Sequence, residues 1–124
     1  MLYFAGDNIF AMEAAIFDLD GTLADLFELH YQGFRRLVWE ELGLEFERAD
    51  LEAHYGKTGE DILKAFLEEK GLIADYRALA IKRRRWVVDN LKTCAVLPGA
   101  KRLLEELKGA GVYMALGTSN TRDI

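Results

Sequence analysis

The chain has 124 residues and a mass of 14.1 kDa, and 51% of its residues are hydrophobic and 30% are charged. With one proline and one cysteine, this composition is typical of a single globular domain and excludes collagen-like, mucin-like and disulfide-scaffold proteins. The net charge of −5 gives no general reason to expect a nucleic-acid partner, and no apolar run approaches the roughly 20 residues of a membrane span.

Residues 1–11 show no clear periodicity and are interpreted as an N-terminal extension. The extension is either natural or precedes an original initiator at Met12, and the sequence leaves both alternatives open. It lacks the basic stretch of a secretory signal. Cys94 permits no internal disulfide, which fits a reducing compartment, so we expect a cytoplasmic protein.

The first predicted element is a short strand. The apolar run Ala14-Ala15-Ile16-Phe17 is followed directly by the turn-forming sequence Asp18-Leu19-Asp20-Gly21. Such a run predicts a strand that is buried on both faces and ended by a tight turn.

Three helices are predicted in the next part of the chain. Apolar residues recur every three to five positions over residues 25–42 and predict an amphipathic helix that ends at Gly43. Thr58 is expected to cap a second helix, which Gly71 ends. A third helix is predicted over residues 74–91.

The third helix carries the basic run Lys82-Arg83-Arg84-Arg85. This run could contact an anion. We favour a solvated helix face, because Trp86, Val87 and Val88 can supply the buried side.

The last predicted elements are a helix over residues 100–108 and a buried strand over residues 112–116. A strand–helix–strand unit closes as a parallel pair with a right-handed crossover. The predicted fold class is therefore α/β, with the helical block inserted between the first strand and the crossover helix.

Asp18 and Asp20 lie two positions apart at the end of the first strand, so both carboxylates can face one cleft. Carboxylates this close either raise one pKa or recruit a cation, which leaves one as an acid and the other as a nucleophile or metal ligand. Gly21 allows a sharp turn and is expected to present backbone N–H groups to an anion. The alternative is an ordinary aspartate turn.

Thr118-Ser119-Asn120 follows the second strand. The carboxyl ends of parallel strands meet at one edge of a sheet, so Thr118 should lie near Asp18 and Asp20. A hydroxyl and N–H groups beside two carboxylates suit a phosphoryl group whose charge a divalent ion helps neutralise. The alternative for residues 118–120 is a plain loop.

The sequence Phe17-Asp18-Leu19-Asp20-Gly21-Thr22-Leu23 resembles the first motif of the haloacid dehalogenase-like superfamily of phosphotransferases. The segment from Leu97-Pro98-Gly99 to Thr118 is similar to the approach to the second motif, and the helical block is similar to the small helical cap. The resemblance implies a partial Rossmann-like core of parallel strands at residues 12–24 and 95–124, with an α-helical cap bundle at residues 25–94.

The resemblance also implies roles for individual residues. Asp18 would attack phosphorus and form an aspartyl-phosphate, and Asp20 would act first as acid and then as base. Mg²⁺ would be held by the Asp18 carboxylate and the backbone carbonyl of Asp20. Thr118 would hydrogen-bond a phosphoryl oxygen, with Ser119 and Asn120 as further substrate-binding candidates beside Gly21.

An acid at Asp20 favours phosphatase or phosphomutase chemistry over the dehalogenase branch. Relatives with this cap type include phosphoglycolate phosphatases and β-phosphoglucomutases. Gly59 stands where a mutase is expected to carry an arginine, which favours a phosphatase acting on a small phosphorylated metabolite. Lys57 is a candidate substrate contact or an exposed lysine before a helix, and His30 is interpreted as a partly buried helix histidine.

The resemblance places a lysine motif and an acidic metal motif after Thr118, whereas the sequence ends at Ile124. We therefore expect an N-terminal piece that is weakly active or inactive alone. Exposed sheet edges would favour a homodimer or a second polypeptide that supplies the missing core. The alternatives are a β-phosphoglucomutase-like phosphomutase and a non-catalytic oligomerising fragment.

Overall fold

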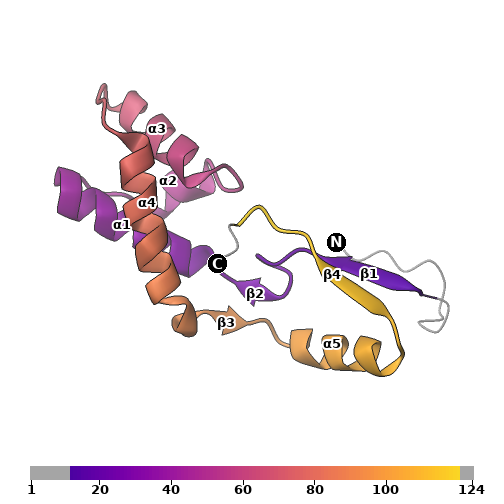
Figure 1. Cartoon of the computed structure of the whole chain (residues 1–124). Helices are drawn as coiled ribbons and strands as arrows, with labels where there is room; N and C mark the ends of the chain where they lie inside the picture. Colours follow the sequence, from indigo (N-terminus) through magenta and orange to yellow (C-terminus); the bar gives the residue numbers. More distant parts are fainter. Residues whose placement is uncertain (1–11, 121–124) are drawn as a thin grey trace. The chain divides into compact units, whose positions relative to one another are not determined.

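The computed structural model describes residues 12–120, which form two compact units. Residues 12–27 and 94–120 form the first unit, and residues 28–93 form the second (Figure 1). The chain passes between them at 27/28 and 93/94, compared with the expected 24/25 and 94/95. The predicted N-terminal extension lies outside the described residues.

Two parallel strands joined through a helix form the framework of the first unit. β1 (Ala14–Phe17) pairs in parallel with β4 (Tyr113–Leu116), and α5 (Ala100–Gly109) precedes β4. The register pairs Phe17 with Leu116 at the carboxyl ends of the strands. This arrangement confirms the predicted α/β class.

One apolar cluster holds α5 against β1. Phe17, Leu107 and Val112 are each at most 6% exposed and pack together. Leu103 and Leu104, one turn before Leu107, complete the helix face that contacts this cluster. Each fully buried side chain of this size contributes about 1.5–3 kcal/mol to folding.

The other side of this two-stranded pair is open. Ile16 is 76% exposed and Tyr113 is 81% exposed. Alternate residues of a strand face opposite sides, so Ile16 lies on the side away from Phe17 and the apolar cluster. The expectations that β1 is buried on both faces and that β4 is a buried strand are therefore wrong for the residues that the structure describes.

A second, very short strand pair was not predicted. β2 (Ala24–Asp25) pairs antiparallel with β3 (Ala95–Val96), and the amide of Leu97 donates to the carbonyl of Leu23 at 2.9 Å. Strands of two residues are too short to show a hydrophobic period, so no sequence pattern marked them. The pairing joins the two chain segments that lead into and out of the helical unit.

The second unit is helical. It contains α1 (Phe27–Leu42) from its second residue onward, α2 (Arg48–Glu52), α3 (Gly59–Glu69), α4 (Tyr76–Asp89) and the 3₁₀ turn η2 (Leu91–Thr93). The three long helices confirm the predicted ones to within about two residues at most ends. The structure adds α2, which was not predicted because it has five residues and a single buried one, Leu51.

Aromatic rings centre the core of the helical unit. The ring centroids of Phe34 and Phe46 are 5.2 Å apart, and those of Phe46 and Phe66 are 4.9 Å apart. Both distances are typical of favourable aromatic pairs. The side chains around them with at most 3% exposure are Val38, Leu51, Ile62, Leu63, Leu67 and Val87.

Local signals set the start of α3 as the sequence predicts. The hydroxyl of Thr58 accepts a hydrogen bond from the amide of Asp61 at 3.1 Å and donates one to its carboxylate at 2.7 Å. The cap satisfies one of the amide groups that a helix start leaves unpaired. Gly43 and Gly71 end their helices at φ of 64° and 69°, a backbone conformation that other residues rarely adopt.

Arg83 corrects the interpretation of the basic run as a solvated face. Its exposed fraction is 8%, whereas its neighbours Lys82 and Arg85 are exposed. Arg83 lies four positions after Leu79 and four before Val87, both buried, so helical geometry turns all three inward. That spacing was available in the sequence.

Across the described residues, none of the helices combines the length and the apolar character that crossing a membrane requires.

Candidate active site

The two parallel strands of the first unit end at the same edge. The amide of Gly117 donates a hydrogen bond to the carbonyl of Phe17 at 2.7 Å. Asp18 is the residue after Phe17, and Thr118 is the residue after Gly117. Parallel pairing therefore brings the backbone at Asp18 and the backbone at Thr118 together, although they are far apart in sequence.

Asp18 is exposed beyond the end of β1. Its Oδ1 accepts a hydrogen bond from the amide of Leu19 at 2.9 Å, which fixes the side chain near its own backbone. A carboxylate oxygen that is exposed and held in place meets the steric requirement for a nucleophile.

Asp20 is half-buried in the turn after β1. Its Oδ1 accepts a hydrogen bond at 3.2 Å from the amide of Leu26, a residue that is only 2% exposed. The buried segment before α1 thereby orients this carboxyl group. The hydrophobic pattern gave no sign of this contact, because the donor is a backbone amide.

Gly21 forms the turn between the two elements. Its φ is 77°, and its amide donates to the carbonyl of Ala24 at 2.8 Å. The next three amides donate to the carbonyl of Leu19 at 2.9–3.3 Å. Gly21 therefore serves the turn itself, and its amide is not available to an anion in this structure, which differs from the expectation.

Thr118 begins a small turn after β4. Its Oγ1 accepts a hydrogen bond from the amide of Asn120 at 3.1 Å, which leaves the hydroxyl proton for another acceptor. Thr118 and Ser119 are exposed and Asn120 is half-buried. A phosphoryl oxygen is an acceptor of the kind that this hydroxyl can serve.

The donors at this edge suit Mg²⁺ in their chemistry. Asp18 offers a carboxylate and Asp20 a backbone carbonyl, and Mg²⁺ binds hard oxygens, commonly with one or two carboxylates plus water and substrate phosphate. Among residues 12–120, no cluster of three or more His, Cys, Asp and Glu side chains could hold a metal. The predicted pair therefore fits Mg²⁺ only with further oxygen ligands.

Lys57, the other predicted substrate contact, lies in the helical unit just before the N-cap of α3. Its Nζ is 3.1 Å from Nδ1 of His54, and Nε2 of His54 is 3.7 Å from a carboxylate oxygen of Glu69. The side chain of Lys57 is exposed. Its contact with a substrate stays a prediction.

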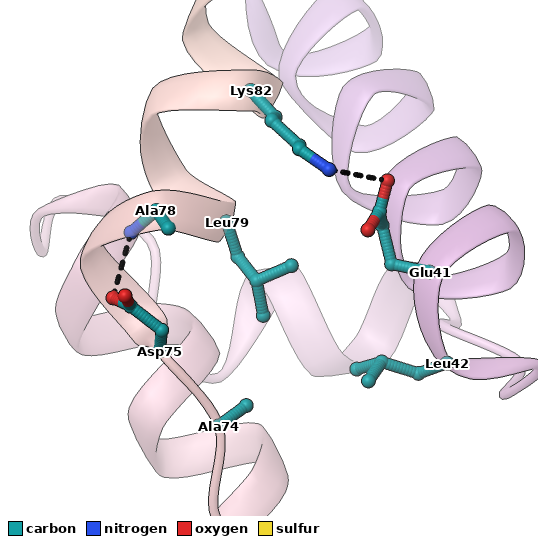
Figure 2. A pocket seen from close by; sticks show the side chains of 7 residues that line it. All are labelled: Glu41, Leu42, Ala74, Asp75, Ala78, Leu79 and Lys82. Carbon is teal, nitrogen blue, oxygen red and sulfur yellow. Dashed lines mark hydrogen bonds and ion pairs between the residues drawn. The ribbon is translucent and has the colours of Figure 1, made fainter.

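A pocket in the helical unit contains none of the predicted site residues (Figure 2). Lys82 Nζ donates to Glu41 at 2.9 Å, and Asp75 accepts the amide of Ala78 at 3.0 Å as the N-cap of α4. The polar groups drawn at this pocket are thus engaged with one another, and Leu79 supplies apolar surface. The pocket therefore gives no sign of a catalytic or binding site.

Comparison with known proteins gives one family. The family model described as haloacid dehalogenase-like hydrolase matches residues 15–124. The chain is 30% identical over 117 residues to the β-phosphoglucomutase of Bacillus subtilis, covering 88% of this chain and 51% of that protein. It is 30% identical over 112 residues to the phosphorylated carbohydrates phosphatase of Thermotoga maritima, covering 87% and 50%. The chain spans about half the length of these curated relatives.

Solved structures of related proteins share the fold of this chain. CbbY from Rhodobacter sphaeroides in complex with phosphate superposes with a TM-score of 0.78 at 26% identity, covering 90% of this chain and 53% of that one. The β-phosphoglucomutase of Clostridium difficile gives a TM-score of 0.70 at 25% identity, covering 85% and 50%. Because the family model spans nearly the whole chain and its first motif stands at the end of β1, this chain belongs to the haloacid dehalogenase-like hydrolase family.

Proposed function

We propose that this chain carries the nucleophile and the acid–base half of a Mg²⁺-dependent phosphatase acting on a small phosphate monoester, such as a phosphoglycolate-like metabolite. The observation that carries the proposal is the common edge at which Asp18 and Thr118 follow paired strands. That edge combines an exposed carboxylate, a second carboxyl group held by Leu26 and a hydroxyl donor.

In the proposed reaction, a carboxylate oxygen of Asp18 attacks phosphorus and the bond from phosphorus to the ester oxygen breaks. Protonated Asp20 donates its proton to the departing alkoxide. Asp20 then accepts a proton from a water molecule, which attacks phosphorus and breaks the bond to Asp18. Thr118 donates a hydrogen bond to a phosphoryl oxygen in both steps. The products are an alcohol and inorganic phosphate.

The Asp18 carboxylate and the Asp20 carbonyl would hold Mg²⁺, which supplies neutralisation of phosphoryl charge when bound. Asp18 alone would carry two tasks, attack and metal binding. The resemblance places further oxygen ligands and a charge-neutralising lysine after Thr118. We therefore propose that this chain is weakly active by itself.

A phosphomutase is the second candidate, favoured by the 30% identity to a β-phosphoglucomutase. Both reactions share the aspartyl-phosphate and differ in the acceptor, which is water for a phosphatase and a sugar hydroxyl for a mutase. Gly59, which has no side chain to bind a second phosphate, supports the phosphatase.

The proposed setting is cytoplasmic, since the chain has one cysteine, Cys94. A second copy of this chain or a second polypeptide would cover the open face at Ile16 and Tyr113, whose exposed fractions are 76% and 81%. Burying side chains of this kind is favourable by about 1.5–3 kcal/mol each.

Phosphoryl transfer to the protein tests the proposal without requiring turnover. The purified chain is incubated with acetyl phosphate and Mg²⁺, and its intact mass and phosphorylated peptide are measured. We expect one phosphoryl group on Asp18, absent in Asp18→Asn and released by hydroxylamine. Asp25→Asn, a change at an exposed aspartate of the same unit, is the control that keeps the label. A label that persists in Asp18→Asn, or no label in the wild-type chain, overturns the proposal.

A further inference from the structure

His54 lies between a lysine and a carboxylate on the surface of the helical unit. Its Nδ1 lies 3.1 Å from Nζ of Lys57, and its Nε2 lies 3.7 Å from a carboxylate oxygen of Glu69. The side chain of His54 is only 19% exposed, whereas Lys57 is exposed. The ring is thus largely shielded, while the amine that it contacts is open to a reagent in solvent.

A tight turn holds the lysine beside the imidazole. The amide of Lys57 donates to the carbonyl of His54 at 3.1 Å, and Gly56 between them has a φ of 94°. Turns of this kind favour glycine at the position of positive φ. The amide of His54 donates in turn to the carbonyl of the buried Leu51 at 3.1 Å. The backbone therefore fixes the imidazole and the amine relative to each other.

The neighbours of His54 define which ring nitrogen carries the proton. A lysine ammonium group is only a donor, so Nδ1 of His54 accepts from Lys57 and the ring proton lies on Nε2, toward Glu69. The carboxylate of Glu69 stabilises the positive charge that develops on the ring when Nδ1 takes up a proton. An amine, a base within hydrogen-bond reach of it and a carboxylate that orients the base form the arrangement of an activated nucleophile.

We propose that Lys57 is a modification site that is acylated by an acyl phosphate, with His54 as the general base and Glu69 as a positioning residue. The ammonium group first loses one proton to solvent. Nζ then attacks the carbonyl carbon of the donor, and Nδ1 of His54 takes up a second proton from the nitrogen. The bond from carbon to the phosphate oxygen breaks, and its electron pair leaves with the phosphate.

The products are an amide at Lys57 and inorganic phosphate, and His54 returns its proton to solvent. A phosphate leaving group suits this cluster, because phosphate departs as a stable anion and needs no proton donor. Acylation also removes the positive charge of the lysine. The reaction goes beyond the proposed phosphatase and does not depend on it, since neither Asp18 nor Mg²⁺ takes part.

Competition between lysines of the same chain tests the proposal. The complete chain is incubated with acetyl phosphate and a metal chelator, and acetylation of each lysine is followed by peptide mass spectrometry. We expect Lys57 to react at least about tenfold faster than Lys64, an exposed lysine of α3, because a positioned general base accelerates proton transfer. The acetyl amide resists hydroxylamine, which distinguishes it from a phosphoryl group on Asp18. Equal rates at Lys57 and Lys64 in the folded chain overturn the proposal.

Three variants assign the roles. His54→Asn places an amide where the imidazole stood and removes the base, so Lys57 should react no faster than Lys64. Glu69→Gln should give an intermediate rate, and Glu68→Gln, at the neighbouring exposed carboxylate, should keep the wild-type rate. A wild-type rate at Lys57 in His54→Asn refutes the general base, and a wild-type rate in Glu69→Gln refutes the positioning role.

Two further measurements separate these roles from a general loss of structure. The rate at Lys64 should be the same in every variant, and in unfolding urea Lys57 and Lys64 should react equally. The ¹⁵N resonances of the His54 ring identify the nitrogen that carries the proton. We expect Nε2–H in the wild type and a mixture of tautomers in Glu69→Gln. A wild-type ring with its proton on Nδ1 excludes the hydrogen bond from Lys57 and overturns the proposal.

Discussion

The amide of Gly117 donates a hydrogen bond to the carbonyl of Phe17 at 2.7 Å, one residue before Thr118 and Asp18 respectively. This is the last backbone contact between the paired strands before the candidate catalytic residues. The pairing of β1 with β4, which this hydrogen bond extends by one residue, therefore sets the position of Thr118 relative to Asp18.

Replacing Gly117 by proline removes the amide that donates to Phe17. We expect a loss of about 1–3 kcal/mol in the free energy of unfolding, because the buried carbonyl loses its partner. Gly117→Ala is the control, since its Cβ would meet Ile16 Cγ2 at an ordinary 3.6 Å. Urea unfolding measures both, and equal stability of the two variants would contradict the role of this bond.

Gly33 of α1 lies at a close contact with α4. A Cβ there would lie 3.0 Å from Cγ2 of Val87 and 3.3 Å from Cε3 of Trp86. We expect Gly33→Ala to destabilise the chain by about 1–3 kcal/mol through overpacking. Gly109→Ala in α5 has open space around its Cβ and should be neutral or stabilising. A Gly33→Ala variant as stable as Gly109→Ala would show that the helices can separate without cost.

Burial, together with the neighbouring charge of Arg84, lowers the pKa of Arg83 well below its ordinary value, to about 10. The unfolded chain then holds this proton more tightly than the folded chain, so the charge opposes folding below about pH 10. The free energy of unfolding should rise with pH from there toward the ordinary pKa of arginine. We expect Arg83→Met to be equal to or more stable than the wild type at pH 7, by about 1–3 kcal/mol at most, as found when buried charges are replaced by apolar groups.

Urea unfolding of both proteins at pH 7 and near pH 10.5 checks this sign. The advantage of Arg83→Met should shrink at the higher pH, because the wild-type chain then begins to fold without the charge. An advantage that grows with pH would mean that the folded chain stabilises the charged guanidinium.

The open face at Ile16 should associate in solution. We expect the chain to sediment above its monomer mass of 14.1 kDa and Ile16→Lys to shift it toward the monomer. Ile73→Lys is the control, because Ile73 is 92% exposed on the loop after α3 of the other unit. Monomers of the wild type at all concentrations would exclude self-association and leave a second polypeptide as the partner.

Much of the fold was predictable because it depends on local patterns. The strand at Ala14–Phe17 and the cap at Thr58 follow from an apolar run and from a hydroxyl before an apolar helix stripe. The common edge of Asp18 and Thr118 followed from the rule for parallel strands. These features need no knowledge of distant contacts.

The remaining features depend on backbone groups or on tertiary packing. The contact from Leu26 to Asp20 and the engaged amide of Gly21 are backbone hydrogen bonds, which side-chain patterns do not encode. The charge of Arg83 favours a solvated face, whereas its spacing from the buried Leu79 and Val87 favours the interior, where the side chain lies. For a buried charged residue, the residue type predicts exposure while the helical period predicts burial.

The pairing of Ala24–Asp25 with Ala95–Val96 has a consequence for how this chain can vary. β2 and β3 flank the helical segment and pair with each other, so the segment between them is a loop whose two ends are held together. Lengthening such a loop costs free energy only slowly. Helices could be exchanged, lengthened or lost between these ends over evolution while the register of Phe17 with Leu116 stays the same.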